Sequence, residues 1–225
     1  MRKLLLLTFI SLIPIFANAQ SSHDFIWNPE LSYSWSTSDR VSYTTKLSIF
    51  NDLGELGNQA AMSYIEPQFL MSYGVSTRFK VGGGYYYRWS VPLLDGYNYE
   101  HRFLQQIGYI SFIGDRRLAH RFRLEQRVRS STYQNRIRYR LSYDFPLQGE
   151  RLDPGENYLI FKNELMTAFN ASAADAENRF SAGLGWFFNN RYKFEFNLQY
   201  RTQDIFSGQE ITHLFLAGTS FYFNQ

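Results

Sequence analysis

The sequence predicts an all-β protein folded as an antiparallel transmembrane β-barrel of about ten to twelve strands. Three observations lead to this fold class: a strict alternation of apolar and polar residues, a confinement of charge to one face of the predicted strands, and a leader-like N-terminal segment. Composition excludes other classes. The 225 residues include no cysteine, which excludes a disulfide scaffold, and a hydrophobic content of 44% is too high for intrinsic disorder.

The first segment has the pattern of a secretory signal peptide. An Arg-Lys pair precedes an apolar run over residues 4–17, and residues 17–19 supply the small side chains of a cleavage site. A membrane-anchoring helix would need about 18 or more apolar residues in an unbroken run, and Pro14 interrupts this one. We therefore predict a cleaved signal peptide over residues 1–19 and a mature barrel domain over residues 20–225, exported through the periplasm.

From about residue 24 onward, apolar and polar side chains alternate with the period of two that defines a strand with one polar face. In residues 192–201, for example, aromatic and aliphatic residues at even positions alternate with charged residues and amides at odd positions. No window holds a convincing helical stripe. We expect strands at residues 24–37, 40–51, 62–73, 76–90, 99–113, 117–131, 134–146, 157–169, 178–189, 191–204 and 210–223.

The charged residues test this interpretation. Almost all acidic and basic residues within the expected strands fall on the polar face of their own strand, and Arg191, at the edge of a turn, is the exception. A slip of one residue in any strand would move its charges to the other face. The formal net charge of +3 and the mean hydropathy of −0.36 are therefore averages over two unlike faces.

The same alternation fits a soluble barrel with the apolar face inward and an outer-membrane barrel with that face toward lipid. Four features favour the membrane: strands of about 12 residues, tight turns that alternate with longer gaps, aromatic residues near both ends of the apolar face, and an aromatic last strand at residues 214–223. The tight turns fall near residues 38–39, 74–75, 114–115 and 189–190, and the longer gaps at residues 51–61, 90–98, 170–178 and 205–209.

We therefore predict a location in the bacterial outer membrane, with the lipid bilayer and outer-membrane lipid as partners. A soluble periplasmic β-barrel that binds a ligand in its core is the alternative. One feature conflicts with the membrane prediction. Bacterial barrels usually have an even number of strands with both termini in the periplasm, whereas eleven strands start the chain on the opposite side. Either one strand is miscounted or the first strand is irregular, so ten to twelve strands remain open.

Some motifs combine arginine with aromatic and aliphatic residues in alternation. They occur at residues 100–103, 120–127 and 135–140, and Asn163-Glu164-Leu165 follows them. These motifs resemble an uncharacterised family of Gram-negative proteins, the domain-of-unknown-function family twenty-four-ninety, over most of the mature chain. The resemblance implies a signal peptide and an outer-membrane barrel. It implies no activity, because none is assigned to that family.

The polar face is expected to line the lumen and to carry an excess of positive charge. The basic residues predicted to line it are Arg121, Arg123, Arg127, Arg129, Arg136, Arg138 and Arg140, and their predicted acidic partners are Glu100, Glu125, Glu164 and Glu195. Two functions follow from this arrangement: a non-catalytic scaffold or narrow channel filled by salt-bridged side chains, and an anion-biased pore or site for a small anionic solute. The connections are expected to be acidic, through residues such as Asp175 and Glu177.

Catalysis is not expected, although small barrels include lipid-modifying enzymes. His101, His120 and His213 fall on the apolar face, and no histidine is placed with a serine and an acid as nucleophilic chemistry requires. We predict no metal site, no cofactor and no nucleic-acid partner, and the sequence identifies no partner protein. The glycines at residues 82–84 lie inside an expected strand, so they indicate a bend or a close approach of side chains rather than a phosphate-binding loop.

Overall fold

A computed structural model describes residues 24–53, 61–90, 98–114, 116–129, 132–170, 174–206 and 211–225. The predicted signal peptide, residues 1–19, lies outside these ranges, as does His23. Among the described residues there is no helix of the length and hydropathy that a membrane-spanning helix requires.

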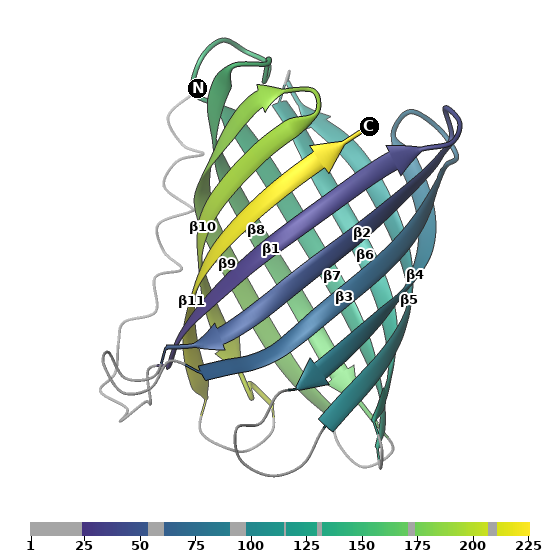
Figure 1. Ribbon diagram of the computed structural model, residues 1–225, viewed down its shortest axis with the longest axis vertical. Helices are drawn as coiled ribbons and strands as arrows, with labels where there is room; N and C mark the ends of the chain where they lie inside the picture. Colours follow the sequence, from purple (N-terminus) through teal and green to yellow (C-terminus); the bar gives the residue numbers. More distant parts are fainter. Residues whose placement is uncertain are drawn as a thin grey trace.

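The described residues form eleven strands that close into a barrel (Figure 1). The strands are β1 (Asp24–Ser36), β2 (Val41–Asp52), β3 (Ala61–Gly74), β4 (Phe79–Ser90), β5 (Asn98–Ile113), β6 (Arg116–Arg129), β7 (Tyr133–Pro146), β8 (Glu156–Phe169), β9 (Ala174–Asn189), β10 (Tyr192–Gln203) and β11 (Thr212–Asn224). The predicted all-β barrel of ten to twelve strands is therefore confirmed, and each expected strand corresponds to one observed strand.

Closure of the barrel explains the odd strand number. Consecutive strands pair antiparallel, but β1 pairs with β11 in parallel, from Asp24 opposite Leu214 to Ser34 opposite Asn224. Figure 1 shows β1 in purple beside β11 in yellow. The count of eleven is correct, and β1 is a complete strand. The odd number therefore needs neither a miscounted strand nor an irregular first strand. The start of β1 and the end of β11 consequently lie at opposite ends of the barrel.

The connections differ from the prediction in two places. We call the end where β1 turns into β2 the turn end, and the opposite end the loop end. The turn end has tight turns but also the long β7–β8 connection, residues 147–155, so long connections are not confined to one end. At the loop end, β9 begins at Ala174 because alternation continues through Asp175 and Glu177, and its first residues pair with the end of β8, where Ala174 lies opposite Phe169. The expected acidic loop is therefore wrong for these two residues, which belong to a strand.

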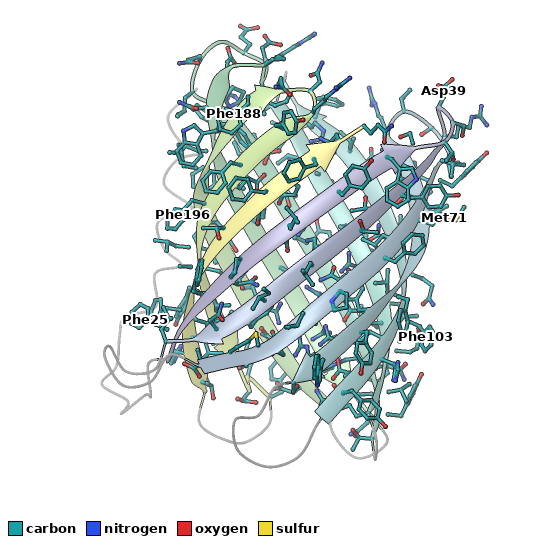
Figure 2. The ribbon with its side chains drawn as sticks, viewed as in Figure 1. Phe25, Asp39, Met71, Phe103, Phe188 and Phe196 are labelled. Atoms are coloured by element: carbon teal, nitrogen blue, oxygen red, sulfur yellow. The ribbon has the colours of Figure 1, made fainter. Side chains whose placement is uncertain are left out.

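The two faces of the sheet have opposite character, because successive side chains of a strand point to opposite sides. Large apolar side chains such as Phe103, Met71 and Phe196 point away from the barrel (Figure 2). The buried polar side chains point into the lumen and include Glu100, Arg102, Arg123, Glu125, Arg136 and Glu164. The molecule is thus apolar outside and charged inside.

Aromatic rings gather on the outward face near both ends of the strands. At the turn end, Trp35 stacks between Tyr33 and Tyr43 with ring centroids 5.5 and 5.4 Å apart. At the loop end, Tyr200 stacks on His213 at 5.7 Å and hydrogen-bonds its Nδ1 at 2.7 Å. Rings with one polar edge suit the zone where an apolar surface meets water.

Several lumenal glycines occur where neighbours leave no room for a side chain. A Cβ added at Gly84 would collide with the backbone oxygen of Phe69 and with the side chain of Leu70. Gly82 is similarly confined by the backbone of Met71. The glycine run in β4 therefore marks a close approach to β3, as the sequence predicts.

Candidate functional site

The seven predicted arginines lie on the lumenal faces of β6 and β7. Register places Arg121 opposite Arg140, and Arg123 opposite Arg138. Like charges that face each other directly across a sheet are destabilising unless other groups compensate them. The compensation must come from the carboxylates that reach these four guanidinium groups, and it is incomplete.

Glu125 is the central carboxylate of this network and is fully buried, at 0% exposure. It accepts hydrogen bonds from Nε of Arg136 at 2.8 Å and from Nη1 of Arg138 at 2.7 Å, while Nη1 of Arg123 lies 3.7 Å away. Glu164 binds the other side of Arg138 and also accepts from Nη2 of Arg121 at 2.8 Å. Arg138 is therefore clamped between two buried carboxylates.

A second part of the network surrounds Glu100 toward the loop end. Its carboxylate takes a bidentate contact from Arg127, at 2.9 and 2.8 Å, and a further contact from Arg129 at 2.5 Å. Arg102 joins Glu100 to Glu66, whose carboxylate it contacts at 3.1 Å. Arginine can bridge two acids in this way because its planar fork presents five N–H donors.

Glu195 differs from the other predicted acids, since no arginine binds it within the described residues. Its oxygens accept from the hydroxyl of Tyr158 at 2.9 Å, Nζ of Lys162 at 3.1 Å and the hydroxyl of Tyr222 at 3.3 Å. Gly185 lies between Tyr158 and Glu195 in the sheet register, and a Cβ there would overlap the Tyr158 ring. The glycine thus gives the tyrosine room to cross the intervening strand.

Contacts that skip one strand recur throughout the lumen. Arg121 on β6 reaches Glu164 on β8, and Arg123 on β6 donates to the hydroxyl of Tyr86 on β4 at 2.6 Å. The curvature of a closed barrel brings inward side chains of alternate strands together, and long side chains span the gap. Alternation of residues predicts which face a residue occupies but contains no information about these second-neighbour contacts.

Several members of the network were therefore missed as partners, although their position on the polar face was evident from the sequence. Glu66 accepts from Nε of Arg88 at 2.8 Å, and Arg179 lies 3.9 Å from Glu164. Glu177, expected in a loop, binds Arg179 from within β9. The sequence offered only the alternation of polar and apolar positions. That alternation identifies the lumenal residues but does not show which of them bind each other.

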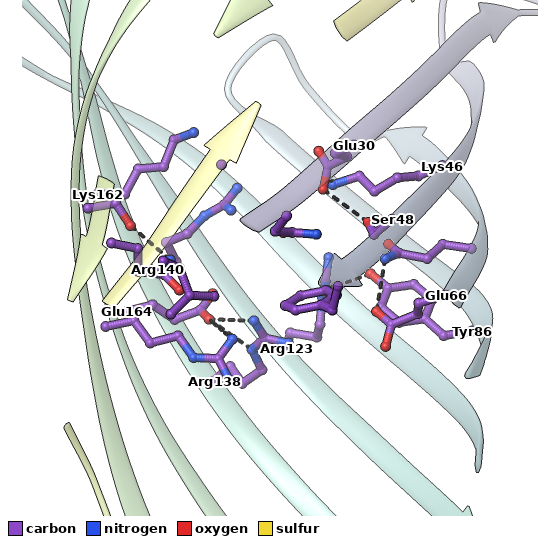
Figure 3. A pocket seen from close by; sticks show the side chains of 18 of the residues that line it. Glu30, Lys46, Ser48, Glu66, Tyr86, Arg123, Arg138, Arg140, Lys162 and Glu164 are labelled. Atoms are coloured by element: carbon purple, nitrogen blue, oxygen red, sulfur yellow. Dashed lines mark hydrogen bonds and ion pairs between the residues drawn. The ribbon is translucent and has the colours of Figure 1, made fainter. Parts of the chain in front are cut away.

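A cavity of about 230 Å³ lies in the middle of the lumen (Figure 3). Eleven basic and three acidic residues line it, and the acidic ones are Glu30, Glu66 and Glu164. In Figure 3, Arg123, Arg138 and Arg140 face Glu30, Lys46 and Ser48 across the open space. The cavity therefore has a strongly basic wall on one side and a weakly charged wall on the other.

Four buried guanidinium nitrogens have no hydrogen-bond partner in the described part of the chain: Nη2 of Arg102 and the Nε atoms of Arg121, Arg123 and Arg140. All four arginines line the cavity. Arg140 is also without an ion pair to any described carboxylate. Buried polar groups are normally satisfied, so these four donors are open to an acceptor other than the protein, whether water or a bound group.

A second space, of about 870 Å³, opens at the turn end. Its lining includes Arg78, Arg116, Arg117 and Lys193 together with Asp144. Arg116 lies over the Phe145 ring at 4.5 Å and Arg78 over the Phe112 ring at 5.2 Å. Arg117 and Lys193 lie on the lumenal faces of their strands, and Arg78, just before β4, follows the same lumenal alternation. Arg116 and Phe145 lie on the outward face, so three of these four basic residues belong to the turn end of the lumen.

The described histidines lie on the outward face, each beside a tyrosine. His101 contacts the Tyr85 hydroxyl at 2.5 Å, and His120 contacts the hydroxyls of Ser111 at 2.7 Å and Tyr139 at 2.8 Å. Within the described residues, no three His, Cys, Asp or Glu side chains are grouped as metal ligands would be.

Taken together, these features define an eleven-stranded β-barrel with an apolar exterior and an arginine-rich, ion-paired lumen. A family model described as "Protein of unknown function (DUF2490)" matches residues 22–212, so the chain belongs to that family. The family resemblance expected from the sequence is thereby confirmed. Searches of curated proteins and of solved structures found no match.

Proposed function

We propose that the protein is an integral β-barrel of the bacterial outer membrane, reached through the periplasm, with a non-catalytic role as a scaffold or narrow channel. The observation that carries the proposal is the reversed polarity of the sheet. In the described part of the chain, thirty-three large hydrophobic side chains are exposed and seven are buried, whereas the buried set is mostly polar or charged. A soluble protein rarely exposes an apolar patch above a few hundred Å², and lipid is the solvent that removes this conflict.

Polar side chains on the outward face support the same proposal, because they bind one another. Gln105 and Gln126 exchange two amide hydrogen bonds at 3.2 and 3.1 Å, and Asn163 donates to Asn178 at 3.2 Å. Such internal pairing is what a surface without water requires, since unpaired polar groups are costly in hydrocarbon. Each strand has at least 12 residues, and a tilted strand needs about 9–11 to cross a bilayer.

The four tryptophans provide a direct test of the membrane location. Trp27 and Trp89 lie on the outward face near the loop end, and Trp35 and Trp186 lie on it near the turn end. In vesicles, lipids brominated near the headgroup should quench tryptophan fluorescence strongly, and lipids brominated at the chain ends should quench it less. A mature protein that stays soluble without detergent and is not quenched by either lipid would support the periplasmic alternative.

The lumen is proposed to be narrow because its ion-paired side chains fill most of it. In planar bilayers we expect a wild-type conductance near zero, and a measurable increase when Arg123 and Arg138 are both replaced by alanine. These two side chains line the central cavity and bind Tyr86, Glu125 and Glu164. A large, anion-selective conductance of the wild-type protein would favour the open-pore function instead.

A further inference from the structure

The central cavity is deficient in negative charge even after every described ion pair is counted. Eleven basic residues line it, against three acidic residues. Four more carboxylates bind these basic residues from outside the lining, namely Glu100, Glu125, Glu177 and Glu195. Seven carboxylates therefore serve eleven cations, and Glu100 is in addition shared with Arg127 and Arg129.

The unbalanced charge is concentrated at one place. Arg121 and Arg140 face each other across β6 and β7, and Arg123 lies two residues along β6 from Arg121. Each of the three has a buried Nε–H with no partner among the described residues. An acceptor group held between them would satisfy these donors and would remove the repulsion between the opposed guanidinium groups.

We propose that the central cavity binds a small dianionic oxyanion of the phosphate class, held by Arg121, Arg123 and Arg140. Phosphate matches the site in charge, because several cations lack a counter-charge, and in its acceptors, because its several oxygens can accept from the three separate Nε–H donors. The inference rests on the narrow basic lumen proposed above, but it does not depend on where the barrel is located.

Cavity size limits the ligand. A volume of about 230 Å³ is well above the roughly 10–15 Å³ that a single water needs, so the cavity holds a small ion together with water. Inorganic phosphate or a small phosphomonoester fits with some water. The position inside the lumen favours a soluble ion over the phosphate of a lipid headgroup, whose acyl chains would have to follow it into a polar space.

The test is a phosphate titration of the purified full-length mature barrel in detergent, monitored by calorimetry. The pH and ionic strength are held constant, with chloride as the balancing ion. Wild-type protein should bind phosphate saturably. The Arg140→Gln variant should bind at least about tenfold more weakly, since a charged donor contact is lost. Without phosphate, the same variant should melt at a higher temperature than wild type, because the repulsion from Arg121 is relieved.

Arg129→Gln is the matched control, since it removes the same charge at the loop end. Arg129 is half-exposed and does not line the cavity, and Glu100 keeps its contacts with Arg127 and Arg102. Its phosphate affinity should stay within about twofold of wild type, as expected for a screened, distant charge.

Three results would overturn the proposal: no saturable phosphate binding by the wild type, equal affinity of the Arg140→Gln variant, or equal losses in the two variants. Binding of a short-chain phosphatidic acid without binding of inorganic phosphate would also overturn it, in favour of a lipid ligand. Tryptophan quenching by brominated lipids is independent of all these results, so a failure of the membrane proposal is recognised separately.

Discussion

The lumenal faces of β4–β9, here called the arginine wall, differ sharply from those of β11, β1 and β2, here called the closing wall. The arginine wall carries buried carboxylates such as Glu125 and Glu164, each bound by several arginines. The closing wall is lined largely by small residues such as Ser32, Ser48 and Ser220, which are buried without charge. Its ion pair between Lys46 and Glu30, at 2.7 Å, is partly exposed.

The difference reflects how each part of the barrel is connected. Strands of the arginine wall follow one another along the chain as antiparallel hairpins, so their charges can be paired by local registers. The closing seam joins the two ends of the chain in parallel, through contacts such as the Tyr33 hydroxyl donating to Gln225 at 2.6 Å and the Phe25–Phe215 ring stack. A seam lined by small side chains can close without a second set of charges having to match.

The largest expected effect is the loss of a buried carboxylate from the arginine wall. Glu125→Gln removes the charge that Arg136 and Arg138 bind, and leaves both guanidinium groups buried without full compensation. We expect the free energy of unfolding to fall by about 3–5 kcal/mol, measured by urea titration in lipid vesicles. The matched change in the closing wall is Ser48→Ala, which removes one 3.3 Å hydrogen bond to Glu30 and should cost less than about 1 kcal/mol. Equal costs in the two walls would contradict the comparison.

The closing seam also shows where the sequence was informative about the fold. Alternation predicts every strand, because a strand with one polar face leaves a period of two in the chain. It does not predict the parallel pairing of β1 with β11, because a strand shows the same alternation whether its neighbour runs parallel or antiparallel. Strand β9 was expected to begin four residues late because Asn170 and the small residues after it suggested a loop.

In the candidate site, the sequence identified the lumenal arginines but not the contacts that they make. Arg102 is 2% exposed and joins Glu66 on β3 to Glu100 on β5, a connection across β4 that depends on the register of three strands. Tyr158 reaches Glu195 only because Gly185 leaves space on the strand between them. Curvature and register therefore decide the partners, and neither is encoded in the residue pattern of a single strand.

Two tyrosines, one in the arginine wall and one on the outward face of the closing seam, give the next largest contrast. Tyr86 is buried and accepts a 2.6 Å hydrogen bond from Arg123, so Tyr86→Phe leaves a buried guanidinium donor unpaired and should cost about 1.5–3 kcal/mol. Tyr33 is exposed at the seam, so Tyr33→Phe should cost less than about 0.5 kcal/mol. Urea titrations of the two variants check the difference, and a larger loss for Tyr33→Phe would show that the seam is the more sensitive region.

Glycines test the packing of the two walls in the same way. Gly185→Ala forces a methyl group into the ring of Tyr158 and should lower the free energy of unfolding by about 1–3 kcal/mol. At Gly218 in the closing wall, the nearest atoms are the side-chain amide of Asn197, at 2.8 and 2.9 Å. That amide is the far end of a flexible side chain, so Gly218→Ala should be milder than Gly185→Ala in the same assay. Adding Tyr158→Ala to Gly185→Ala should remove the extra steric cost, and a fully additive double variant would rule out this contact as its source.

A small effect is also expected for the ion pair of the closing wall. Lys46→Met leaves Glu30 with its contact to Ser48 and with access to water, since the Lys46 and Glu30 side chains are 25% and 16% exposed. We expect a loss of about 0.5–1 kcal/mol. Salt sharpens the contrast, because screening weakens accessible pairs more than buried ones. At 1 M salt the cost of Lys46→Met should shrink toward zero, while that of Glu125→Gln should persist. If both costs fell together, the lumen would be uniformly hydrated, and the contrast between the buried ion pairs of Glu125 and the partly exposed Lys46–Glu30 pair would have to be abandoned.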